Sequence, residues 1–178
     1  TYRCVLECEH CFTCSGPSRD ESISLKNIRS ILNQAMDLGT IDWIYFEGGE
    51  PFLYYPLLAE GVDIASTMNF KVGIVTNGYW ATSVEDATYW LKDFEGKIDD
   101  LAISSDLFHW NEKLAKLAEN ACEAAEKLGI DSGILKVLQP DEDATDYEFM
   151  PDVFVFGLRY RGRAAEKLVY RLKKWTSW

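Results

Sequence analysis

The chain has 178 residues, of which 47% are hydrophobic, and it carries a formal net charge of −11 at pH 7. This size fits one domain with one core, and no apolar run approaches the roughly 20 residues of a membrane-spanning helix. We therefore expect a cytoplasmic protein without a membrane span, and the acidic charge argues against a nucleic-acid substrate.

Helices and strands are expected to alternate along the chain. Apolar residues three and four positions apart predict helices, and short continuous apolar runs predict strands. The expected helices cover residues 25–38, 56–68, 84–94, 111–128 and 164–174, and the expected strands cover 41–46, 71–76, 100–104, 133–138 and 153–158. Strands that are apolar throughout are typical of a parallel sheet covered by helices. We predict an α/β fold, a partial TIM-type (βα)6 barrel with a parallel sheet.

The strongest chemical signal is the cysteine spacing near the start of the chain. Cys4, Cys8 and Cys11 form a C-x3-C-x2-C motif. Three thiolates on one loop can hold three irons of a cubane cluster and leave the fourth iron open to a ligand. A closed site is the alternative, because Cys14 and His10 are further ligands for zinc or a cluster, in a binding module or a ferredoxin-type electron carrier. A disulfide framework does not fit five cysteines, four of them in one loop.

Polar and turn-forming residues follow three of the predicted strands. They are Gly48, Gly49, Glu50 and Pro51 after the first, Thr76 and Asn77 at the second, and Ser104 and Asp106 at the third. In a barrel of parallel strands, these ends meet on the face that carries active sites. The glycines let the backbone approach a ligand, and the Glu50 carboxylate suits an ammonium group. His109 is a candidate substrate contact or proton donor, with a structural histidine as the alternative.

This combination of motifs resembles the radical S-adenosylmethionine (SAM) enzymes. The resemblance rests on the three cysteines with His10 before the last of them, and on Gly48-Gly49-Glu50-Pro51. It implies a [4Fe-4S] cluster on Cys4, Cys8 and Cys11, whose open iron is chelated by the amino and carboxylate groups of SAM. A flavodoxin- or ferredoxin-like donor would reduce the cluster. SAM would then split into methionine and a 5′-deoxyadenosyl radical that takes a hydrogen atom from the substrate.

The resemblance also implies roles for the residues at the strand ends. Gly48, Gly49 and Glu50 would meet the amino group of SAM, while Thr76, Asn77, Ser104 and Asp106 would meet its carboxylate and ribose. Arg163 lies in a Gly-Arg-Ala segment similar to one near the adenine and the methionine carboxylate in members with a C-terminal auxiliary-cluster domain; a basic helix start is the alternative. Those members favour peptide modification or cofactor maturation, on a peptide or small-molecule substrate.

Two features depart from the family pattern. Only three residues precede Cys4, where the family has its first strand, and no auxiliary domain follows. We therefore interpret residues 1–178 as a radical SAM core domain with a truncated first strand. The acidic stretch 139–152 is too short for a helix with loops, so we expect a locally eroded barrel, or missing residues, at this point.

Overall fold

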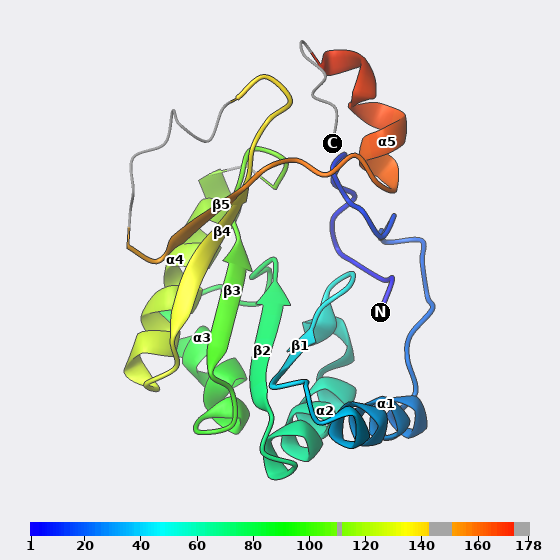
Figure 1. Cartoon of the computed structure of the whole chain (residues 1–178). Helices are drawn as coiled ribbons and strands as arrows, with labels where there is room; N and C mark the ends of the chain where they lie inside the picture. Colours follow the sequence, from blue (N-terminus) through cyan, green and yellow to red (C-terminus); the bar gives the residue numbers. More distant parts are fainter. Residues whose placement is uncertain (110–111, 143–150, 173–178) are drawn as a thin grey trace.

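Five parallel strands form one sheet in the order β1-β2-β3-β4-β5 (Figure 1). The structure is a computed structural model that describes residues 1–109, 112–142 and 151–172. The strands are β1 (Trp43–Phe46), β2 (Lys71–Thr76), β3 (Asp100–Ser104), β4 (Ser132–Val137) and β5 (Val153–Phe156). The helices are α1 (Leu25–Leu38), α2 (Tyr55–Thr67), α3 (Val84–Leu91), α4 (Glu112–Lys127) and α5 (Arg163–Lys167), with 3-10 turns η1 (Pro51–Tyr54), η2 (Lys92–Phe94) and η4 (Val169–Arg171).

One face of the sheet carries the hydrophobic core. Alternate residues of the strands, among them Val72, Ile74, Leu101 and Ile103, are fully buried on this face. Helix α2 packs on β1 and β2, and α4 packs on β3 and β4. The sequential strand order leaves β1 and β5 at opposite edges. The predicted α/β fold with a parallel sheet is therefore confirmed, and the barrel is open.

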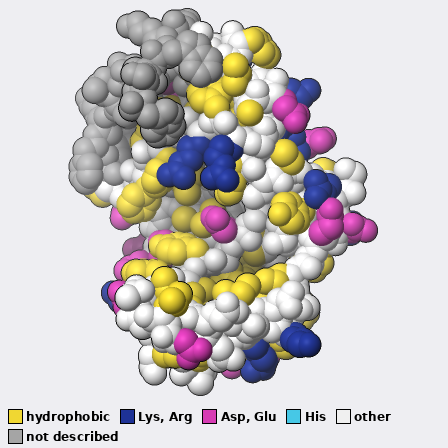
Figure 2. Space-filling view, turned by 45° about the vertical axis from the view of Figure 1, so that its right-hand side comes forward, with side chains coloured by type: hydrophobic (Ala, Val, Ile, Leu, Met, Phe, Trp, Pro, Cys, Tyr) yellow, Lys and Arg dark blue, Asp and Glu magenta, His cyan; other side chains and the backbone are white. Residues whose placement is uncertain are grey.

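The opposite face of the sheet is hollowed. A cavity of about 1260 Å³ lies there, with Tyr45, Ala102, Leu135, Phe154 and Phe156 among its lining residues. Figure 2 shows hydrophobic side chains on this hollowed side of the molecule, with a group of Lys and Arg side chains beside them. The lining also includes acidic side chains, among them Asp99, Asp100, Asp131 and Asp152, so the open barrel presents a concave surface of mixed apolar and acidic character.

Two aromatic rings of the hollowed face lie flat across glycines of the neighbouring strand. A Cβ at Gly73 would stand 2.2 Å from Cε1 of Tyr45, and one at Gly133 would stand 2.6 Å from Cε2 of Phe154. The Tyr45 hydroxyl then reaches the next strand and donates to Asp100 Oδ2 at 2.9 Å. The glycines thus make room for the rings, and the hydroxyl ties β1 to β3.

Most predicted elements are confirmed, with differences at the ends of some of them. The predicted bounds of α1, β2 and β3 are those observed, whereas β1 begins two residues late and the helix expected over 84–94 changes to the 3-10 turn η2 after Leu91. The helix expected over 164–174 is wrong as a single helix, because Leu168 (φ −120°) separates α5 from η4. Residues 143–150 and 173–178 lie outside the described part of the chain, so the expected erosion of the barrel within 139–152 stays a prediction.

No helix in residues 1–109, 112–142 and 151–172 combines the length and the apolar character that crossing a bilayer requires.

Candidate active site

The cysteine motif lies on a loop, residues 4–16, that is closed at its neck by backbone hydrogen bonds. The Cys4 amide donates to the Gly16 carbonyl at 3.2 Å, and the Gly16 amide donates to the Tyr2 carbonyl at 3.2 Å. Within the loop, the Cys11 amide donates to the Cys8 carbonyl at 3.2 Å. All five cysteines of the chain are free thiols. We call residues 4–16 the cysteine loop.

The environments of the thiols differ. Burial raises the pKa of Cys4 to about 11, although its Sγ accepts from the Leu6 amide and from Asn77 Nδ2, both at 3.4 Å. Burial also acts to raise the pKa of Cys11, but hydrogen bonds from Thr13 and Ser15 outweigh this effect and lower the pKa of this thiol. Cys11 is therefore the readier of the two to become a thiolate ligand.

The turn Gly48-Gly49-Glu50 lies directly against the start of the chain. The Gly49 amide donates to the Thr1 carbonyl at 2.6 Å, and the Glu50 amide donates to the Arg3 carbonyl at 2.8 Å. A Cβ at Gly49 would lie 2.0 Å from the Arg3 carbonyl oxygen, and Gly48 has φ +136°, so both positions require glycine. The close approach that these glycines permit is therefore that of the residues just before Cys4.

Glu50 is a fully buried carboxylate at the end of β1. Its Oε1 accepts from the Phe52 amide at 3.1 Å and the Thr76 hydroxyl at 2.9 Å, and its Oε2 accepts from the Asn77 amide at 2.8 Å. Burial outweighs these bonds and raises the pKa of Glu50 to about 7. Within the described residues, no ion pair involves Glu50. A buried carboxylate without a cationic partner is suited to a ligand that brings a positive charge.

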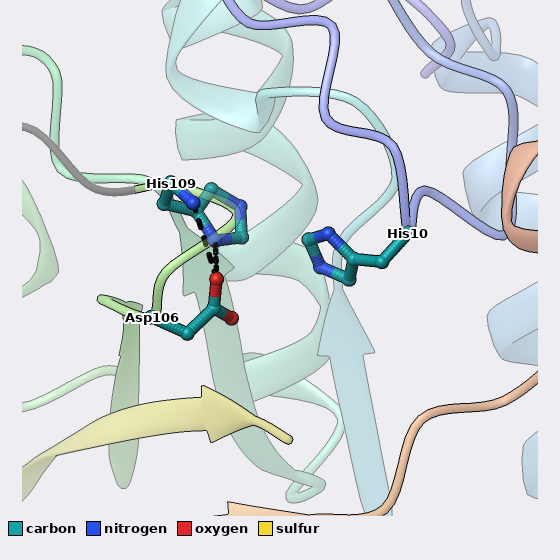
Figure 3. A group of neighbouring side chains, drawn as sticks. All are labelled: His10, Asp106 and His109. Carbon is teal, nitrogen blue, oxygen red and sulfur yellow. Dashed lines mark hydrogen bonds and ion pairs between the residues drawn. The ribbon is translucent and has the colours of Figure 1, made fainter. Parts of the chain in front are cut away.

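A second group consists of Asp106 and His109, which follow β3, and His10 of the cysteine loop (Figure 3). Asp106 Oδ1 accepts from His109 Nδ1 at 2.9 Å and from the Phe108 amide at 2.8 Å. The His10 ring stacks on Phe108 with 4.5 Å between centroids and meets His109 edge-on at 4.9 Å. His10 Nδ1 is buried and has no hydrogen-bond partner among the described residues.

Asp106 and His109 form a hydrogen-bonded ion pair when the histidine is protonated. Burial lowers the pKa of His109, but its hydrogen bonds with Asp106 and Cys8 prevail and raise that pKa to about 10. Burial and the charge of His109 lower the pKa of His10 to about 4, although Asp106 acts in the opposite direction. The ligand atoms of His10, Asp106 and His109 lie within 4.8 Å of one another. The sequence did not single out His10 as a member of this group.

The remaining predicted site residues have distinct positions. Pro51 is buried and begins η1, for which Glu50 is the N-cap. Ser104 ends β3 and is half-buried, on the same strand face as Ala102. Arg163 lies against the cysteine loop, where its guanidinium donates to the Cys8 and Ser15 carbonyls, each at 2.6 Å.

Fold and site together define an α/β domain with the cysteine loop and, at the carboxyl edge of a parallel sheet, a buried carboxylate that has no ion pair among the described residues. The chain belongs to the Radical SAM superfamily, whose family model matches residues 1–150.

Curated relatives match parts of the chain. YydG of Bacillus subtilis (strain 168), named as a candidate peptide biosynthesis protein, is 30% identical over 108 residues, which are 60% of this chain and 34% of YydG. An S-adenosylmethionine-dependent nucleotide dehydratase of Selenomonas ruminantium is 33% identical over 78 residues, 44% of this chain and 27% of that protein. The chain thus spans about a third of the length of these relatives.

Among solved structures, Streptococcus suis SuiB bound to the precursor peptide SuiA resembles this chain with a TM-score of 0.47 at 17% identity. The match covers 76% of this chain and 37% of SuiB.

Proposed function

We propose that this chain is the SAM-cleaving core of an enzyme that modifies a peptide. The observation that carries the proposal is Glu50, a buried carboxylate without an ion pair among the described residues, joined through Asn77 to Cys4. Membership of the Radical SAM superfamily supports the cofactor chemistry. The candidate peptide biosynthesis protein YydG supports a peptide as the substrate class.

Cys4, Cys8 and Cys11 would hold the [4Fe-4S] cluster in this proposal. The cluster and SAM, when bound, supply a 5′-deoxyadenosyl radical by one-electron cleavage of the sulfonium, and the electron comes from a flavodoxin- or ferredoxin-like donor. The protein tunes the reduction potential through hydrogen bonds to the ligand sulfurs. The donors include Asn77 Nδ2 and the Leu6 amide on Cys4, and Thr13 with the Ser15 amide on Cys11.

Glu50 would bind the ammonium group of SAM. A cation beside this buried carboxylate favours its ionised form and so offsets the effect of burial on its pKa. Gly48 and Gly49 hold the turn against residues 1–3, and Pro51 starts the 3-10 turn that follows.

The polar ends of β2 and β3 would complete the SAM site. Thr76, Asn77, Ser104 and Asp106 are our candidates for the carboxylate and the ribose. His109 is a candidate contact for an anionic or carbonyl group of the substrate, because its hydrogen bonds with Asp106 and Cys8 raise its pKa and so favour the protonated ring. The hollow on the open face offers room for a substrate.

Electron paramagnetic resonance tests the cofactor part of the proposal. We expect the anaerobically reconstituted, reduced protein to give a [4Fe-4S]+ signal that changes when SAM is added, with release of 5′-deoxyadenosine. Glu50→Gln should keep the signal and lose its response to SAM. Glu47→Gln is the matched control, because Glu47 lies in the same turn but is exposed. A wild-type signal indifferent to SAM, or zinc in place of iron, would overturn the proposal.

A comparison of substrates tests the peptide part. Two of the curated relatives are nucleotide dehydratases, so a nucleotide is the competing class. Release of 5′-deoxyadenosine should rise above the substrate-free rate with a mixture of synthetic peptides and stay at that rate with a mixture of nucleoside triphosphates. The reverse result would assign the chain to nucleotide chemistry.

A further inference from the structure

Arg163 lies beyond the residues that match the family model, yet it binds the cysteine loop at three points. Nη1 donates to the Cys8 carbonyl and Nη2 to the Ser15 carbonyl, each at 2.6 Å. The Arg163 backbone amide donates to the Cys11 carbonyl at 3.0 Å. One residue thus connects the middle of the loop with its closing end.

These contacts occupy the guanidinium in a largely buried place. Only 12% of the Arg163 side chain is exposed. Charge-assisted hydrogen bonds are among the strongest in proteins, and a planar guanidinium can reach two carbonyls that one ammonium group cannot reach together. Glu7 stands 3.7 Å away with 67% of its side chain exposed, so it adds little to the binding.

Gly162 brings the chain into direct contact with the same loop. A Cβ at this position would lie 2.4 Å from the Phe12 carbonyl oxygen and 2.8 Å from that of Cys11, and the residue has φ +56°. Figure 1 shows the start of α5 beside the N-terminal segment. Only glycine permits both this backbone conformation and this approach.

We propose that Gly162 and Arg163 form a clasp that holds the cysteine loop in its ligand-binding shape. Arg163 is then a positioning residue that acts through the loop, not a direct contact of SAM as the sequence suggested. Any effect of the clasp on a bound cluster rests on the proposed function, whereas its effect on the loop does not. It follows that the segment after the family match is needed to order the motif at the start of the chain.

Hydrogen exchange of the metal-free full chain tests the clasp without iron or SAM. The amides of Cys11, Cys14 and Gly16 are bonded within the loop and its neck. In Arg163→Gln we expect these amides to exchange about tenfold faster or more, the range expected when hydrogen bonds to a charged group are lost. Amides of β2 and β3 should keep the wild-type rate. Arg159→Gln removes an exposed arginine from the same segment and is the matched control.

Two further variants keep the test decisive. Gly162→Ala retains the guanidinium but forces the backbone away from Phe12, so it should also accelerate the loop amides. Arg163→Lys should give an intermediate rate, because the ammonium retains one carbonyl contact. Loop amides at the wild-type rate in both Arg163→Gln and Gly162→Ala would overturn the clasp. Equal acceleration in the loop, β2 and β3 would also overturn it, since it would indicate a general effect on stability.

The reconstituted protein gives a second readout. Because the clasp positions Cys8 and Cys11, Arg163→Gln should broaden or shift the [4Fe-4S]+ resonance and release iron faster to a chelator, with partial rescue in Arg163→Lys. An unchanged resonance and unchanged iron loss would contradict a positioning role. Failure of the proposed function would show differently, as a wild-type protein that does not respond to SAM while the exchange pattern of the loop stays as expected.

Discussion

Asn77 connects the cysteine motif with the buried carboxylate of Glu50. Its side-chain Nδ2 donates to Cys4 Sγ at 3.4 Å, while its backbone amide donates to Glu50 Oε2 at 2.8 Å. The end of β2 therefore fixes the first cysteine and the buried carboxylate relative to each other. A substitution that moves Cys4 is therefore expected to affect the position of Glu50, and a substitution at Glu50 to affect that of Cys4.

Asn77→Ala should lower the reduction potential of the reconstituted cluster. A hydrogen bond to a ligand sulfur stabilises the reduced state, which carries one more negative charge. If the hydrogen bond stabilises the reduced cluster by about 1 kcal/mol, its loss lowers the reduction potential by about 40 mV for a one-electron couple. A redox titration followed by electron paramagnetic resonance measures this shift. Asn33→Ala, an exposed position on α1, is the control; equal potentials in the two variants would contradict the role of Asn77.

Glu50 should make the stability of the metal-free protein fall as the pH rises from about 4.5 to about 7. Burial raises its folded pKa to about 7, above the ordinary value of 4.5, so the folded state binds more protons in this window. The free energy of unfolding therefore decreases with rising pH there, by up to roughly 3 kcal/mol from this residue. Urea unfolding across the window measures the slope.

Glu50→Gln isolates this contribution, because the amide does not titrate. Across the window the wild type should lose stability relative to Glu50→Gln, by up to roughly 3 kcal/mol, whereas the difference between the wild type and Glu47→Gln should stay nearly constant. Parallel curves for the wild type and Glu50→Gln would show that Glu50 has an ordinary pKa in the folded protein.

Gly49→Ala should destabilise the metal-free protein. The new methyl group would meet the Arg3 carbonyl oxygen at 2.0 Å, so residues 1–3 must move and lose their hydrogen bonds to the turn. We expect a loss of about 1–3 kcal/mol in urea unfolding. Gly157→Ala provides the control, since a Cβ there has no neighbour within 4 Å. Equal losses in the two variants would show that the contact between the turn and Arg3 is dispensable.

Cys14→Ala separates the three-thiolate site from a closed four-thiolate site. Cys14 is half-buried, and its backbone has φ +54°. This left-handed conformation is no less strained for alanine than for cysteine, so the substitution does not relieve backbone strain. We expect this variant to bind the wild-type amount of iron after anaerobic reconstitution, whereas Cys8→Ala should lose most of it. Iron and sulfide analysis gives the answer. Loss of iron in both variants would favour the closed site.

The sequence predicted the central sheet well because its strands are buried on one side by helices and continuous in apolar residues. The bounds of β2 and β3 follow directly from those runs. Helix α1 was equally predictable, because its ends carry residues typical of helix caps. Ser24 accepts from the Asn27 amide at the start, and Gly39 adopts the left-handed conformation at the end. The C-terminal helix was not predictable, because the same apolar spacing fits an α-helix and a 3-10 turn, and the chain leaves the helical conformation at the fully buried Leu168.

The candidate site was predictable where its residues follow strands and unpredictable where loops meet. Glu50, Thr76 and Asn77 converge because parallel strands end at one edge. His10 and Arg163 show the limit. The first meets Phe108 and His109, and the second meets the Cys8 and Ser15 carbonyls, through loop conformations that no periodicity encodes.

The rings that lie across glycines make residues on neighbouring strands dependent on each other. Tyr45 covers Gly73, and Phe154 covers Gly133, on the same face of the sheet but near its opposite edges. In an evolving lineage, a side chain can enter position 73 or 133 only after its aromatic neighbour has become smaller or turned away. These pairs should therefore covary among homologous sequences. Within each pair, the aromatic residue should be replaced by a smaller one before the glycine is replaced.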